Sequence, residues 1–139
     1  MSERKTIMVV DGQGGGLGKA IIEKLREARL DADILAIGTN SSATGVMLRA
    51  GATGAATGEN ALIHNASLVD FIIGPIGMIS ANSMLGEISS KMANSIASAP
   101  CIKMLIPMDK CNLYVGGVSE ETSLADKIDD IVGKVRSLL

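Results

Sequence analysis

The chain has 139 residues, a formal net charge of −2 and an apolar fraction of 47%, which suits a single domain, residues 1–139, with a substantial core. The slightly acidic balance and the aromatic fraction of 1% argue against a nucleic-acid partner, because such surfaces are basic and rich in stacking rings. No apolar run reaches the roughly 18 residues that suggest a membrane span. The first five residues lack a secretory segment, so we expect a cytoplasmic protein.

Short apolar runs alternate with helical patterns and predict an α/β protein. We expect strands at residues 7–10, 34–37, 71–73, 102–106 and 112–116, and a very short edge strand near Ala55. We expect helices at about 16–29, from a Ser or Thr cap within 39–42 to about 50, and at about 58–66, 78–85, 89–98 and 123–138.

This order of elements predicts a Rossmann-like, doubly wound, mostly parallel sheet of five to six strands with helices on both faces. The expected strand order is 3-2-1-4-5-6. The link formed by residues 107–111 is too short for a parallel crossover, so the last strand is expected to be antiparallel at the sheet edge. An open edge invites pairing between subunits, which predicts a homo-oligomer.

The most informative segment is the glycine-rich turn after the first strand. Five glycines occur between Gly12 and Gly18, and an amphipathic helix pattern follows at once. Glycine lets the backbone turn sharply and lets its N–H groups approach an anion without Cβ atoms in the way. The segment therefore predicts a phosphate-binding loop, with a tight strand-to-helix turn as the simpler alternative.

The spacing of these glycines does not match the dinucleotide fingerprint G-x-G-x-x-G or the phosphate loop G-x-x-x-x-G-K-[ST]. It matches G-x-x-x-G-x-G at Gly12, Gly16 and Gly18, which resembles the cofactor loop of short-chain dehydrogenases. The catalytic Tyr and Lys of those enzymes are absent, because the residue four positions after Tyr114 is Val118. The second strand also ends without the acid that holds a ribose hydroxyl, which weakens an NAD assignment.

In a doubly wound sheet, ligands bind outside the carboxyl ends of the strands, at the point where the strand order reverses. The loops expected there are 11–18, 38–42, 57–60, 74–77 and 108–112. The candidate cofactor-binding residues are accordingly Gly12, Gln13, Gly14, Gly15, Gly16, Leu17, Gly18, Lys19, Gly38, Thr39, Asn40, Gly74, Pro75, Ile76 and Gly77.

Three residues are candidates for catalysis, each beside a structural alternative. Asp11 can act as a base or hold Mg²⁺, or can hold the N–H groups of its own turn. Glu59 can be catalytic, or can be an acid in the first turn of a helix, where the dipole favours it. Lys110 can reach a ligand from its loop, or can belong to a solvated turn. Cys101 and Cys111 are separated by a strand length and are expected not to bond to each other, and no metal site is expected.

Several segments together resemble a family of short, uncharacterised bacterial proteins described as a domain of unknown function. They are D-G-Q-G-G-G-L-G-K (11–19), G-T-N (38–40), A-T-G-E-N-A (56–61), G-P-I-G (74–77), N-S-M-L-G-E (82–87) and I-P-M-D-K-C-N (106–112). The resemblance covers nearly the whole chain and implies a Rossmann-like fold of the NAD(P)-binding type. It implies no particular activity.

These observations favour a protein that binds a nucleotide or dinucleotide, with NAD(P) or another phosphate-bearing nucleotide as the ligand and a sensor or an accessory subunit as the expected role. A small enzyme, either a reductase or a phosphate-handling catalyst, is the first alternative. A structural subunit of an oligomer, without a ligand, is the second.

Overall fold

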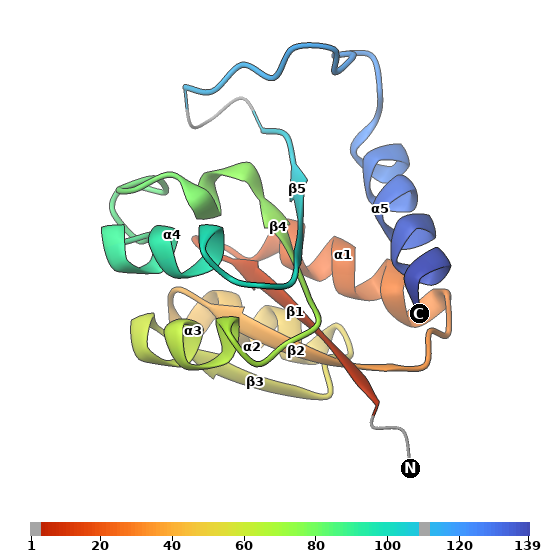
Figure 1. Ribbon diagram of the computed structural model, residues 1–139, viewed down its shortest axis with the longest axis horizontal. Coiled ribbons are helices and arrows are strands. Elements are labelled where there is room, and N and C mark those ends of the chain that lie inside the picture. The colour runs from red at the N-terminus through yellow and green to blue at the C-terminus, as the bar shows by residue number, and fades with distance from the viewer. Residues whose placement is uncertain (1–3, 109–111) are drawn as a thin grey trace.

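The computed structural model describes residues 4–108 and 112–139, which form one parallel sheet with helices on both faces (Figure 1). The strands are β1 (Lys5–Asp11), β2 (Ala32–Gly38), β3 (Gly54–Thr57), β4 (Phe71–Pro75) and β5 (Ile102–Ile106). They lie in the order β3-β2-β1-β4-β5, and all four neighbouring pairs are parallel. The order reverses between β1 and β4. The Rossmann-like α/β fold and the short edge strand near Ala55 are confirmed.

The helices form two layers, one on each face of the sheet. Helices α1 (Gly16–Glu27), α2 (Ser41–Arg49) and α5 (Leu124–Leu138) cover one face. Helices α3 (Glu59–Ala66) and α4 (Ser90–Ala97), with the 3-10 turn η1 (Ile76–Ile79), cover the other. Because consecutive side chains on a strand point to opposite faces, each layer receives every second residue of β1.

The central strand shows how the sequence builds this core. Ile7 and Val9 pack into the cluster with α1 and α5, whereas Met8 and Val10 pack into the cluster with α3 and α4. All four side chains are fully buried. A strand buried on both faces therefore appears in the sequence as an unbroken apolar run, which is why this strand was identifiable.

Residues 112–116 do not form the expected sixth, antiparallel strand, so in the described part of the chain β5 is the edge strand on that side of the sheet, opposite β3. Asn112 has a left-handed backbone with φ of 58°, which does not belong to a strand, and Tyr114 is 87% exposed. The other residues of this segment are exposed as well, except for the half-buried Val115. It runs as an irregular connection towards α5 instead (Figure 1).

The prediction of a helix at 78–85 is also wrong. The chain makes the short turn η1 and then a series of bends through Gly86, with left-handed backbones at Asn82, Met84 and Leu85. Left-handed residues interrupt a right-handed helix. The helix expected at 89–98 is confirmed as α4, and the Ser89 side chain caps it by accepting a hydrogen bond from the Met92 N–H. The cap of α2 is Asn40, not Ser or Thr.

Candidate functional site

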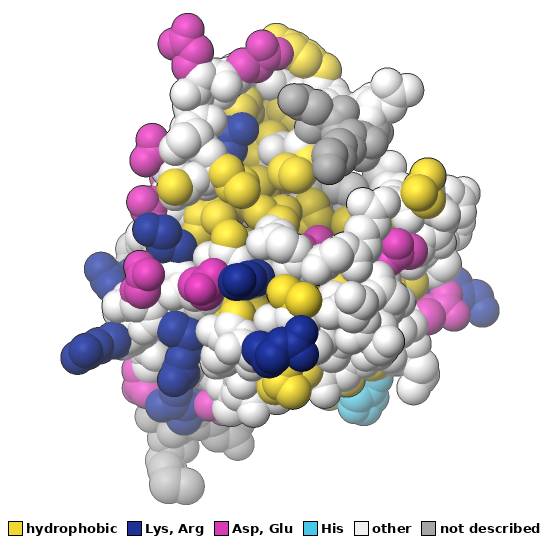
Figure 2. All heavy atoms as spheres, turned by 180° about the vertical axis from the view of Figure 1, so that it is seen from behind, with side chains coloured by type: hydrophobic (Ala, Val, Ile, Leu, Met, Phe, Trp, Pro, Cys, Tyr) yellow, Lys and Arg dark blue, Asp and Glu magenta, His cyan; other side chains and the backbone are white. Residues whose placement is uncertain are grey.

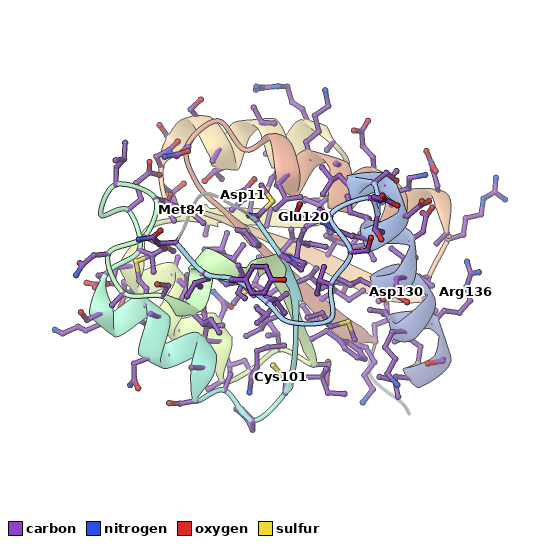
Figure 3. The ribbon with its side chains drawn as sticks, turned by 90° about the horizontal axis from the view of Figure 1, so that it is seen from above. Asp11, Met84, Cys101, Glu120, Asp130 and Arg136 are labelled. Carbon is purple, nitrogen blue, oxygen red and sulfur yellow. The ribbon has the colours of Figure 1, made fainter. Side chains whose placement is uncertain are left out.

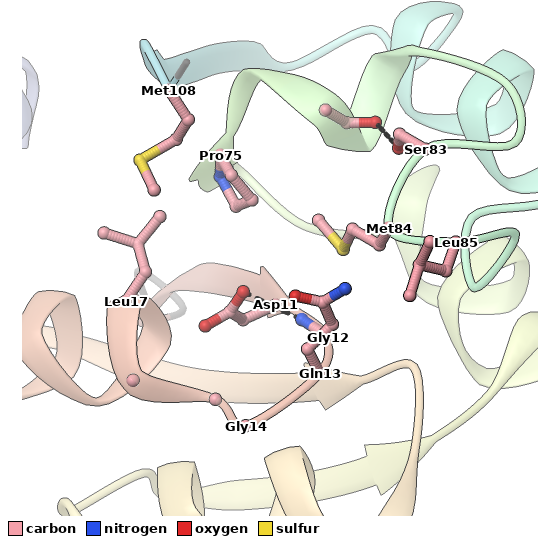
Figure 4. Close-up of a pocket in the computed structure, with 13 residues that line it drawn as sticks. Asp11, Gly12, Gln13, Gly14, Leu17, Pro75, Ser83, Met84, Leu85 and Met108 are labelled. Carbon is pink, nitrogen blue, oxygen red and sulfur yellow. Dashed lines mark hydrogen bonds between the residues drawn. The ribbon is translucent and has the colours of Figure 1, made fainter. Parts of the chain in front are cut away.

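A cavity of about 500 Å³ opens at the carboxyl ends of β1 and β4, where the strand order reverses. Figure 4 shows that Leu17 and Met108 border one side of it and that Met84 and Leu85 border another. Its lining residues are Asp11, Gly12, Gln13, Gly14, Gly15, Gly16, Leu17, Pro75, Gly77, Ser83, Met84, Leu85 and Met108. The position agrees with the general rule for open α/β sheets.

The walls of this cavity are mainly apolar. Five of its side chains are Leu, Met or Pro, and Asp11 is the only side chain with an ionisable group among the described residues that line it. Leu85 is 96% exposed, which is unusual for so large an apolar residue. Figure 2 shows hydrophobic side chains gathered in a hollow on the face seen from behind, with charged side chains around it.

The glycine loop presents two backbone donors to this cavity. Gly15 has φ of 74°, a left-handed conformation that suits glycine, and its N–H donates to the Gly12 carbonyl at 3.0 Å. The N–H groups of Gly14 and Gly16 have no acceptor among the described residues. A Cβ atom at either of these two glycines would meet open space. Both N–H groups are therefore accessible to an anion at the N-terminus of α1.

The Asp11 side chain fixes the glycine loop through hydrogen bonds to its backbone. Its two carboxylate oxygens accept hydrogen bonds from the Gly12 N–H at 2.8 Å and from the Gly18 N–H at 2.7 Å. Asp11 is only 6% exposed, and this burial raises the pKa of its carboxyl, although the backbone N–H groups act to lower it. Both oxygens are engaged with the loop, as in the turn-holding alternative for Asp11.

Glu87 holds the same loop from above. Its Oε1 accepts hydrogen bonds from the Gln13 N–H at 2.9 Å, from the Asn40 Nδ2 at 2.8 Å and from the Thr39 hydroxyl. The Thr39 hydroxyl, followed by the Gln13 N–H, lowers the pKa of the Glu87 carboxyl. We call Glu87 with its three donors the Glu87 clasp. It joins the loop after β4 to the loops after β1 and β2.

The cavity is the open part of a crevice at the carboxyl ends of the strands. The Glu87 clasp occupies the side of this crevice towards β1 and β2. A Cβ atom at Gly12 would lie 2.6 Å from the Thr39 hydroxyl and 2.7 Å from the Met84 sulfur, so a side chain at Gly12 would force these groups to move. The Asn40 Nδ2 also donates to the Gln13 carbonyl at 3.0 Å. Unlike Gly14 and Gly16, Gly12 is needed here for close packing between loops.

The structure brings together part of the set predicted from the sequence. Residues Gly12 to Leu17, Pro75 and Gly77 line the cavity together with Asp11. The other candidates are not among its lining residues: Gly18, Lys19, Gly38, Thr39, Asn40, Gly74 and Ile76. Of these, Gly18 donates to Asp11, Thr39 and Asn40 serve the Glu87 clasp, and Lys19 is exposed.

The remaining candidates lie outside the cavity or outside the described residues. The Glu59 Oε1 accepts a hydrogen bond from the Ser89 hydroxyl at 2.5 Å, which joins the N-termini of α3 and α4. Lys110 and Cys111 lie outside the described residues. Cys101 is a free thiol, and Figure 3 shows it well apart from Asp11 and Met84. Within residues 4–108 and 112–139, no group of acidic, His or Cys side chains could hold a metal ion.

The sequence did not indicate Glu87, Ser83, Met84 or Leu85 as site residues, and it indicated Met108 only as part of the loop 108–112 expected at this edge of the sheet. The first four lie in the segment 82–87, whose sequence was assigned partly to a helix. Asn82 and Gly86 are turn formers that bracket Ser83, Met84 and Leu85, and both have positive φ. They were the available signal that this segment is a loop over the site.

The family model described as a domain of unknown function, DUF3842, matches residues 6–139. The chain belongs to this family. No curated protein matches the sequence. None of the helices in the described part of the chain has the length and apolar character that a membrane span requires.

Solved structures are similar to this chain at low sequence identity. A dodecameric FMN-dependent UbiX-like decarboxylase from Escherichia coli O157:H7 matches with a TM-score of 0.52 and 15% identity, covering 96% of this chain and 93% of that chain. A universal stress protein in complex with cAMP matches with a TM-score of 0.45 and 18% identity, covering 76% of this chain and 98% of that chain. At 15% identity, the likeness to the decarboxylase is one of fold alone.

Proposed function

We propose that this chain binds a phosphate-bearing nucleotide in the cavity between β1 and β4. The observation that carries this proposal is the pair of acceptor-free N–H groups at Gly14 and Gly16, at the N-terminus of α1 and beside open space. Backbone donors at a helix N-terminus favour an anion, because the helix dipole adds partial positive charge there. The phosphate is expected to bind at these two groups.

The rest of the nucleotide is expected to lie between the apolar walls. Leu17 and Met108 on one side, and Met84 and Leu85 on another, offer surface for a planar ring. Thioether sulfurs make favourable contacts with aromatic rings. A volume of about 500 Å³ is within the usual range for small-molecule sites. The decarboxylase of the same fold is FMN-dependent, which is compatible with a ligand of this class.

Binding without turnover is the form of the proposal that the described side chains favour. Asp11 is the ionisable group in the described lining, and both of its oxygens accept backbone hydrogen bonds. A general base needs a free oxygen within reach of the ligand. Assembly into a homo-oligomer through an open edge stays a prediction, with β5 and its half-exposed Ile102 as the edge concerned.

The test is calorimetric titration of the wild-type protein with FMN, AMP, GMP and UMP, and of the variants Gly14→Val and Gly16→Val. Both valines fit the fold, because neither position has positive φ and neither Cβ has a close neighbour, but their side chains would stand in front of the donors. Gly133→Val is the matched control, since Gly133 lies on α5 and its Cβ also meets open space.

We expect at least one mononucleotide to bind the wild type and the Gly133→Val protein, and to bind the two loop variants at least tenfold more weakly. Wild-type protein that binds none of the four probes would overturn the proposal. So would loop variants that bind as well as the wild type.

A further inference from the structure

The Glu87 clasp lies where a dinucleotide would need space. In dinucleotide-binding folds, the pyrophosphate lies on the first glycine loop, and the adenosine ribose lies towards the end of the second strand. In this chain the groups at that place are the Gln13 N–H, the Thr39 hydroxyl and the Asn40 amide. All three donate to one oxygen of Glu87.

We infer that Glu87 is an internal anion that occupies the ribose side of the crevice and thereby restricts the site to mononucleotides. This inference rests on the proposed nucleotide binding at Gly14 and Gly16, which it deepens by naming the class of ligand. The chemistry of the three donors supports it. One N–H, one hydroxyl and one amide NH₂ converge on a single carboxylate oxygen, as they would converge on a phosphate oxygen.

The space around the clasp leads to the same conclusion. A Cβ at Gly12 would lie 3.1 Å from the Glu87 Oε1 and 2.7 Å from the Met84 sulfur, so the loop after β4 packs directly onto the glycine loop on this side. The cavity opens on the other side, towards Pro75 and Met108. A ligand on the Gly14 and Gly16 N–H groups can therefore extend towards β4, whereas the direction of β2 is closed.

Charge adds to the effect of shape. Asp11 and Glu87 are both acidic and both lie against the glycine loop, close enough for the charge of Glu87 to act on Asp11. A second phosphate at the ribose 2′ position would meet the Glu87 carboxylate directly. The negative charges of a carboxylate and a phosphate in contact repel each other. A 2′-phosphorylated ribose is therefore the group that the Glu87 clasp excludes most strongly.

Removing the Glu87 carboxylate should allow a ligand with a 2′-phosphate to bind. Glu87→Ala leaves the Gln13 N–H, the Thr39 hydroxyl and the Asn40 amide without their acceptor, at the place where a 2′-phosphate would lie. The probe is adenosine 2′,5′-bisphosphate, compared with AMP in parallel titrations. Glu27→Ala is the matched control, because Glu27 is an exposed acid on α1 and its removal changes the net charge equally.

We expect wild-type protein and Glu27→Ala to bind the bisphosphate no better than AMP, and Glu87→Ala to bind it at least tenfold more tightly than AMP. Glu87→Ser is the second variant, and circular dichroism at the titration temperature establishes that each protein is folded. The wild type is also expected to bind NADPH no better than AMP.

The inference is overturned if folded Glu87→Ala and Glu87→Ser show no gain for the bisphosphate, or if the wild type binds NADPH more tightly than any mononucleotide. Its failure is distinguishable from failure of the proposed function. If the wild type binds a mononucleotide but the Glu87 variants show no gain for the bisphosphate, the proposed function stands and only the excluding role of Glu87 is wrong. A gain in the variants without mononucleotide binding by the wild type removes the proposed function and the restriction to mononucleotides, and leaves only the exclusion of the 2′-phosphate by Glu87.

Discussion

Two carboxylates hold the glycine loop, and they differ in almost every other respect. Asp11 lies beneath the loop, is 6% exposed, and uses both oxygens to accept backbone N–H groups. Glu87 reaches the loop from the segment after β4 and collects a backbone N–H, a hydroxyl and an amide on one oxygen. The first fixes the shape of the turn within one strand–helix unit, whereas the second joins three separate loops.

The difference in burial decides the direction of each pKa. Both carboxylates accept hydrogen bonds, which favour the charged form. Burial outweighs those bonds at Asp11 and raises its pKa, whereas at Glu87 the hydrogen bonds dominate and lower its pKa. Asp11 is therefore expected to matter for the integrity of the fold, and Glu87 for what the crevice admits.

Removing the Asp11 carboxylate is expected to have the largest effect on stability. Asp11→Ala leaves the buried N–H groups of Gly12 and Gly18 without acceptors, at a cost of about 1–3 kcal/mol for each. Urea unfolding followed by circular dichroism measures the loss. Asp129→Ala, which removes an exposed partner of Lys24, is the control and should cost less than about 1 kcal/mol. Equal losses in the two variants would contradict a structural role for Asp11.

A substitution at Gly12 tests how tightly the glycine loop packs against the Glu87 clasp. Gly12→Ala would place its Cβ 2.6 Å from the Thr39 hydroxyl and 2.7 Å from the Met84 sulfur, so these groups must move. Overpacking of this kind typically costs about 1–3 kcal/mol. Gly14→Ala, two residues away in open space, should be neutral or should stabilise by up to about 1 kcal/mol.

The same urea measurement compares these two variants. If Gly12→Ala is as stable as Gly14→Ala, the crevice above β1 and β2 is not closed, and the contrast between its two sides disappears.

The elements that follow local patterns were predictable from the sequence. The run Ile7–Val10 is apolar because both sheet faces are covered, and the glycine turn followed by a helical pattern placed the site at the end of β1. The segment 112–116 contains the apolar run Leu113, Tyr114 and Val115, which favours a strand, but it is largely exposed, and sequence alone does not reveal whether other elements pack against it.

The site was only half predictable for a related reason. Leu17 and Gly16 lie within the same strand–turn–helix unit as Asp11, so sequence adjacency brought them together. Glu87 lies 74 positions from Gln13, and their contact depends on how the loop after β4 folds over β1. The dinucleotide pattern calls for an acid at the end of β2, and the sequence has none there. Glu87 brings a carboxylate to this place from another loop, where it accepts hydrogen bonds from Gln13, Thr39 and Asn40, and no spacing rule for β2 describes it.

The smallest expected effect is a pH dependence that belongs to Glu87. Its pKa is lower in the folded chain than the ordinary value of 4.5, so its charge stabilises the fold above that value. This contribution is lost as the pH falls through the folded-state pKa. The raised pKa of Asp11 acts with the opposite sign, because ionisation of Asp11 costs stability as the pH rises. Asp11 is present in both the wild type and Glu87→Gln, so its contribution largely cancels when the two are compared.

The wild type should therefore be more stable than Glu87→Gln by about 1 kcal/mol or less at pH 7, since the clasp is partly exposed to solvent. The difference should shrink as the pH falls from about 6 to about 3, a range that spans the ordinary glutamate pKa. Urea unfolding of both proteins at a series of pH values measures it. A difference that stays constant over this range would mean that the Glu87 charge contributes nothing to the clasp, and that its three donors hold an acceptor of any kind equally well.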